Sequence, residues 1–98
     1  MIPDGFVPDI EAVRQGYASG QFTPRALMEY LTARSVRFDA HNIWIHQLSM
    51  AELEPYLQRL ESADREKVPL YGVPFAIKDN IDLDGVPTSA ACPEFAYR

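Results

Sequence analysis

Residues 72–81, Gly-Val-Pro-Phe-Ala-Ile-Lys-Asp-Asn-Ile, decide how this sequence is interpreted. Residues 73–77 are apolar on both faces of an extended chain, which is typical of a strand inside a covered sheet. Lys78 follows directly. Burial disfavours the charged form of an amine, so a lysine at the end of a dry strand could accept a proton as a general base. Alternatively, Lys78 leaves the sheet and pairs with Asp79 or Asp82.

Upstream of this stretch, residues 1–67 are predicted to be mainly helical. Asp9 can cap a first helix, which presents apolar residues at helical spacing and stops near Gly20. Thr23 is followed by a proline, and this pair predicts the start of a second helix that runs to about Val36.

A third helix is predicted where Ser49 and Glu52 have the spacing of a capping box. Pro55 falls inside this region, so either it kinks the helix or the main helix starts there with Pro55 in its first turn. Residues 42–46, Asn-Ile-Trp-Ile-His, predict a short strand. Residues 68–98 contain four prolines and two glycines, and they are predicted to form the strand that precedes the lysine and then a turn-rich loop.

The predicted strands do not make a complete sheet. Residues 42–46 are the one other obvious partner for residues 73–77, and a two-stranded sheet is marginal in water. We therefore expect residues 1–98 to be the N-terminal part of a larger α/β fold. The remainder of that fold, or a second copy of the chain, would cover the open strand edges.

The composition excludes several classes of protein. The 98 residues carry a net charge of -5 with nine scattered basic residues, so neither nucleic acid nor an anionic membrane is an expected partner. The single cysteine, Cys92, is expected to be a buried thiol, and no signal peptide or membrane span is recognisable, so a cytoplasmic location fits best. His41 and His46 lack the further ligands of a metal site. Core positions are expected for four aromatic residues, Trp44, Phe75, Phe95 and Tyr97.

The stretch 72–81, with Gly-Val-Pro-Thr at 85–88, closely resembles the lysine motif of the amidase-signature family, and the likeness runs from Pro69 to Tyr97. The resemblance implies a Ser–cis-Ser–Lys triad that hydrolyses carboxamides on a large α/β fold with a mixed central sheet. Lys78 matches the family's catalytic lysine, whose neutral amine takes a proton from the middle serine as that serine takes one from the nucleophile. No cofactor and no metal are implied.

Both serines of that triad belong to a Gly/Ser-rich segment that lies downstream in the family, and nothing like it occurs here. Ser89 is the serine nearest to Lys78 in the sequence, but it lacks the glycines that would expose a nucleophile. The resemblance therefore implies an N-terminal piece of an amidase domain that supplies the catalytic lysine and is inactive alone.

Residues 90–97, Ala-Ala-Cys-Pro-Glu-Phe-Ala-Tyr, look like the allophanate hydrolase branch, which releases ammonia from allophanate in urea degradation. The expected partner is then a small-molecule amide substrate. The alternatives are a protein like the amidase component of glutamyl-tRNA amidotransferase, a broad-specificity amidase, or a non-catalytic interaction module derived from an amidase N-terminus.

Overall fold

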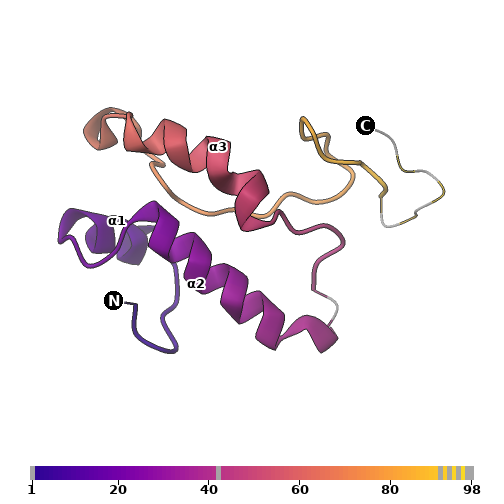
Figure 1. Ribbon diagram of the computed structural model, residues 1–98, viewed down its shortest axis with the longest axis horizontal. Coiled ribbons are helices and arrows are strands. Elements are labelled where there is room, and N and C mark those ends of the chain that lie inside the picture. Colours follow the sequence, from indigo (N-terminus) through magenta and orange to yellow (C-terminus); the bar gives the residue numbers. More distant parts are fainter. Residues whose placement is uncertain (1, 42, 91, 93, 95, 97–98) are drawn as a thin grey trace.

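The computed structural model describes residues 2–41, 43–90, 92, 94 and 96. Helices in the first two-thirds of the chain are joined and followed by irregular segments (Figure 1). In chain order the helices are α1 (Ile10–Ala18), α2 (Pro24–Arg37), the 3-10 helix η1 (Asp39–His41), α3 (Met50–Glu61) and the 3-10 helix η2 (Arg65–Lys67).

The starts of α1 and α2 are fixed by local hydrogen bonds, as the sequence predicts. The Asp9 carboxylate accepts a hydrogen bond from the Ala12 N–H at 2.8 Å, and the Thr23 hydroxyl accepts one from the Ala26 N–H at 3.2 Å. Pro24 is the first residue of α2, where a missing N–H costs no intrahelical bond.

The predicted capping box starts α3. The Ser49 hydroxyl accepts a hydrogen bond from the Glu52 N–H, and the Glu52 carboxylate accepts one from the Ser49 N–H, each at 3.1 Å. The bond from the Ser49 N–H is the main reason why the pKa of Glu52 lies below its usual range. The helix begins at Met50 and continues through Pro55, so the alternative in which the main helix starts at Pro55 is wrong.

Helices α2 and α3 lie side by side and run in opposite directions (Figure 1). Arg25 on α2 forms ion pairs with two carboxylates of α3, Glu54 at 2.5 Å and Glu61 at 3.1 Å. Hydrogen bonds from this guanidinium hold the pKa of Glu54 below its usual range. Leu57 supplies a buried side chain to the chain's interior from α3.

A small core lies where α1 meets the start of α2. Its buried members are Val13, Tyr17, Phe22 and Leu27. The rings of Tyr17 and Phe22 meet edge to face, with centroids 5.3 Å apart. The radius of gyration of 14.8 Å exceeds the roughly 13 Å of a compact domain of this length. The molecule is therefore elongated, and its stability depends on a small buried apolar surface.

The predicted strands are not found among the described residues. Residues 43–46 and 73–78 are irregular, and residues 75–77 are exposed, with Phe75 79% exposed. A strand is stabilised by a hydrogen-bonded neighbour, and neither segment has one within the described part of the chain. The expected burial of residues 73–77 is therefore wrong for this chain, and the expected sheet of the α/β fold is not confirmed.

The expected core positions of Trp44 and Phe75 are wrong for the same reason, because both side chains project from irregular segments; Trp44 is 46% exposed. Phe95 and Tyr97, also expected in the core, lie outside the described residues. Cys92 is half-buried rather than fully buried. Across the described ranges, no helix combines the length and the apolar character that crossing a bilayer would need.

Candidate active site

The segment that leads to Lys78 is attached to α1 through Gly72. The Tyr17 hydroxyl donates a hydrogen bond to the Gly72 carbonyl at 2.5 Å. Gly72 has a φ of 65°, and a Cβ at this position would lie 2.6 Å from Cε2 of Tyr17, so the close approach requires glycine. Burial raises the pKa of Tyr17 above its usual range, and the neighbouring Tyr71 raises it further.

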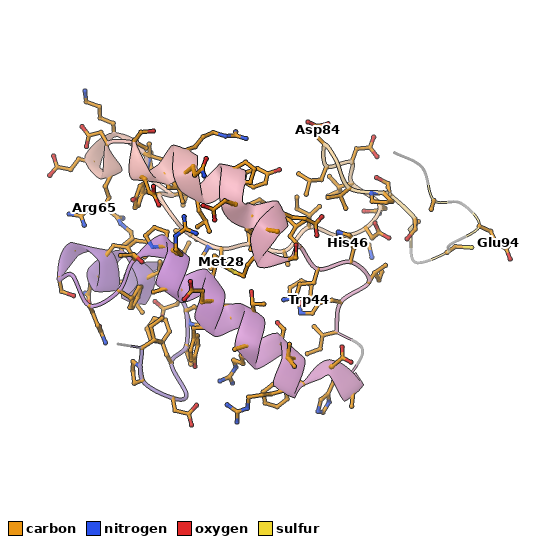
Figure 2. The ribbon with its side chains drawn as sticks, in the orientation of Figure 1. Met28, Trp44, His46, Arg65, Asp84 and Glu94 are labelled. Atoms are coloured by element: carbon orange, nitrogen blue, oxygen red, sulfur yellow. The ribbon has the colours of Figure 1, made fainter. Side chains whose placement is uncertain are left out.

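Arg65 of η2 strengthens this junction. Its Nη1 donates a hydrogen bond to the Tyr17 carbonyl at 2.8 Å, near the C-terminus of α1, where the helix dipole favours a cation. Figure 2 shows Arg65 beside α1, whereas Asp84 lies beyond the other end of α3, on the side toward Glu94. Residues 65–84 therefore run along the length of α3 from one end to the other.

Lys78 itself is exposed. None of the ion pairs between described residues includes it. The alternative in which Lys78 pairs with Asp79 or Asp82 is therefore not what the described residues show. Within the described ranges, dry surroundings for the amine are not supplied either, because the side chains just before the lysine are exposed as well.

The chain after Lys78 turns back on itself. The Ile81 N–H donates a hydrogen bond to the Lys78 carbonyl at 3.0 Å. Leu83 and Val86 then form an antiparallel bridge around a tight turn. In that turn Gly85 has a φ of 82°, the sign that the third position of a type II turn requires.

Side-chain hydrogen bonds close the resulting loop. The Thr88 hydroxyl, in a residue that is 5% exposed, donates to the Asp82 carboxylate at 2.9 Å. Nearer the lysine, the Asp79 carboxylate accepts hydrogen bonds from the Ser89 N–H at 3.2 Å and from the Ser89 hydroxyl. The Asp79 carbonyl accepts one from the Ala90 N–H at 2.8 Å. Ser89 thus has a structural partner in this chain.

The contacts of Asp79 and Ser89 were not anticipated from the sequence. The sequence does contain a feature that predicts this closure. Asp84-Gly85 lies between a leucine and a valine, and such a pair predicts a tight turn that brings the residues before it close to the residues after it. That turn places residues 79 and 89 opposite each other.

The described residues do not assemble a complete catalytic set around Lys78. A cavity of about 230 Å³ lies between the end of α2 and residues 43–47, and one of about 340 Å³ lies beside α1 and η2; neither is lined by Lys78. His41 and His46 belong to no group of three or more metal-binding side chains in the part of the chain that is described. In the structure, Lys78 is exposed and precedes a loop, residues 79–90, that is closed by hydrogen bonds.

Comparison with protein families gives the class. The model of the amidase family matches residues 27–98, which include Lys78 and the whole of the loop that follows it. The chain belongs to the amidase family, and the resemblance seen in its sequence is confirmed.

The chain is similar to three relatives of different kinds. It is 46% identical to the urea amidolyase of Saccharomyces cerevisiae over 81 residues, 82% of this chain and 4% of the relative. It is 37% identical to the putative amidase AmiB2 of Mycobacterium tuberculosis over 76 residues, 74% of this chain and 16% of the relative. It is 32% identical to a glutamyl-tRNA(Gln) amidotransferase subunit of Acidobacterium capsulatum over 91 residues, 87% of this chain and 18% of the relative.

The chain therefore spans less than a fifth of the length of each of these relatives. No solved structure gives a significant match to it.

Proposed function

We propose that this chain supplies Lys78 as the catalytic lysine of an amide hydrolase that releases ammonia from allophanate. The observation that carries the proposal is the family match, which runs through Lys78 and the loop after it. The similarity to a urea amidolyase supports a substrate from urea degradation. We place the reaction in the cytoplasm, in keeping with the expectation from the sequence.

In the proposed reaction, Nζ of Lys78 accepts a proton from a middle serine, which at the same time takes the proton of a nucleophilic serine. The nucleophile attacks the amide carbon, and backbone N–H groups stabilise the oxyanion. The proton held on Lys78 passes back through the middle serine to the amide nitrogen, the C–N bond breaks, and ammonia leaves while the acyl group stays on the nucleophile. Water then hydrolyses the acyl-enzyme. Both serines come from sequence outside this chain in this proposal, so the isolated chain is expected to be inactive.

The proposal requires Lys78 to be neutral when it accepts the proton. Phe75 and Ile77, which precede it, are 79% and 36% exposed in this chain. If the remainder of an amidase domain covers these apolar side chains, the amine loses water and its neutral form is favoured. The expected partner of this segment is therefore the rest of the domain, and the substrate is a small-molecule amide.

The test uses a chimera of the Saccharomyces cerevisiae urea amidolyase in which the aligned residues are replaced by those of this chain. Ammonia release from allophanate is measured for the chimera and for two variants. Lys78→Met is expected to lower the rate by about 10²–10⁴-fold, the contribution of a general base. Lys67→Met is the matched control, because Lys67 is the other lysine of the chain and its side chain is 83% exposed. Equal rates for the two variants would remove the catalytic assignment.

Other amidase branches are the first alternative, favoured by the similarity to AmiB2 and to the amidotransferase. Ammonia release by the same variants is then measured with each substrate in turn. A Lys78-dependent release of ammonia from glutamine or from a simple carboxamide, with none from allophanate, would replace the proposed substrate and keep the chemistry.

A non-catalytic interaction module is the second alternative. It is favoured by the apolar side chains that are exposed on residues 70–81, the lysine segment. Leu70 is 63% exposed and Ile81 is 58% exposed, in addition to Phe75. Light scattering on the isolated chain distinguishes the two cases. A cooperatively melting species of one defined size would favour a module, whereas a polydisperse species would favour a segment that needs the rest of an amidase domain.

A further inference from the structure

The loop from Lys78 to Ala90 is closed at its base by residues that have no assigned role. We propose that Asp79 and Ser89 are positioning residues: their contact fixes the main chain at Lys78 and so sets the point from which its side chain reaches the reacting serine. This inference rests on the proposed role of Lys78 as the proton acceptor.

The contact joins the residue after the lysine to the far side of the loop in three ways. The Asp79 carboxylate accepts hydrogen bonds from both the N–H and the hydroxyl of Ser89, and the Asp79 carbonyl accepts one from Ala90. Hydrogen bonds to a carboxylate are stronger than those between neutral groups. Because both the side chain and the main chain of Asp79 are held, the peptide unit that follows Lys78 has a defined direction.

Ala90 shows that closing the loop imposes a conformational cost. Its φ is 50°, in the left-handed region that is disfavoured for a residue with a Cβ. The chain adopts this conformation where the Ala90 N–H meets the Asp79 carbonyl at 2.8 Å. A strained residue of this kind persists when neighbouring contacts determine it, which is what the two bonds from Ser89 provide.

The rest of the loop supports the same closure. The bond from Thr88 to Asp82 and the bridge between Leu83 and Val86 bring the two flanks of the loop together before residue 89 is reached. Lys78, by contrast, takes part in none of the ion pairs among the described residues. In this structure the contacts around Lys78 therefore act on the main chain, and they set the position of its Cα rather than that of its amine.

The direct test measures the order of the Lys78 backbone amide in the chain itself by ¹⁵N relaxation. In the unmodified chain an order parameter of about 0.85 is expected, the value of a rigid backbone. Ser89→Ala and Asp79→Asn are expected to lower it below about 0.6, the value of a flexible backbone. Ser89→Thr keeps the hydroxyl and is expected to restore it. Ser62→Ala, a serine at the end of α3, is the matched control.

The second readout is the kinetics of the chimera described above. Ser89→Ala is expected to lower kcat by about tenfold with KM within twofold, because a misplaced general base slows the chemical step and leaves substrate binding intact. Ser89→Thr is expected to recover kcat. A change in KM alone would overturn the positioning role.

The two proposals fail in distinguishable ways. If Lys78→Met abolishes activity while Ser89→Ala retains full kcat, the positioning role is refuted and the catalytic role stands. If Lys78→Met is active, the proposed function is refuted, and the relaxation data still decide whether the contact orders Lys78. An unchanged order parameter in Ser89→Ala, in a chain whose helical circular dichroism is intact, overturns the inference by itself.

Discussion

The attachment of the lysine segment to the helices can be tested by removing one oxygen atom. Tyr17→Phe deletes the hydroxyl that donates to the Gly72 carbonyl at 2.5 Å. The ring that remains keeps its edge-to-face contacts with Phe22 and Tyr71, whose centroids lie 5.3 Å and 5.7 Å away. The variant therefore isolates the hydrogen bond from the packing.

The expected cost follows from the burial of the bond. Tyr17 is 6% exposed, so the deletion leaves a half-buried carbonyl without its partner. A net hydrogen bond contributes about 0.5–1.5 kcal/mol, and an unsatisfied buried group costs about 1–3 kcal/mol. We expect a loss of about 1–2 kcal/mol in the free energy of unfolding. At about 4–8 °C per kcal/mol for a chain of this size, the midpoint of thermal unfolding should fall by about 5–15 °C.

The assay is thermal unfolding followed by far-ultraviolet circular dichroism, with Tyr56→Phe as the control. Tyr56 is 41% exposed, so its change should stay within about 0.5 kcal/mol. Equal unfolding temperatures for the two variants would refute the reasoning. The pKa of Tyr17 adds a second signature, since it is raised in the folded state. The protonated hydroxyl of Tyr17 therefore stabilises the fold fully below about pH 10, and this stabilisation is lost as the pH rises further. In Tyr17→Phe this part of the pH dependence of unfolding should be missing.

Two further changes probe the helical part. Gly16→Ala places a Cβ 2.0 Å from Cζ of Phe22. Alanine favours the helix by about 1 kcal/mol, but displacing the buried ring costs about 1.5–3 kcal/mol. Urea denaturation should therefore show a free energy of unfolding lower by about 1 kcal/mol, and a stabilised variant would contradict the packing. The lowered pKa of Glu54 beside Arg25 stabilises the fold above the pKa of an unfolded glutamate, about 4.3, and this contribution is lost as the pH falls further. Unfolding of Glu54→Gln measured between about pH 3 and 6 should therefore depend less on pH than that of the unmodified chain, and identical slopes would argue against the ion pair.

The helix starts could be predicted because the groups that fix them are neighbours in sequence. Asp9, Thr23 and Ser49 each bond an N–H three residues ahead, so a short window contains both the donor and the acceptor. The path through Pro55 was left open by the sequence. It was settled only by the structure, in which the capping box at Ser49 starts the helix before the proline.

The strand at residues 73–77 could not be predicted reliably, because a strand is stable only with a partner that is distant in sequence. An apolar run indicates that a segment tends to be buried but does not say what covers it. In this chain the described residues leave Phe75 79% exposed and Ile77 36% exposed, so the segment is irregular and only partly covered. The motif around Lys78 nevertheless identified the family, since that identification needs residue order and not burial.

The amino-acid order alone thus determined the helices, their caps and the membership of the amidase family. Tertiary structure decided where the lysine segment is attached, through Tyr17 and Gly72, and how its loop is closed, through Asp79 and Ser89. The physical reason is range. Caps and turns are set by contacts three or four residues apart. Asp79 and Ser89 are ten residues apart and Tyr17 and Gly72 are 55 residues apart, so these partners meet only when the chain has folded.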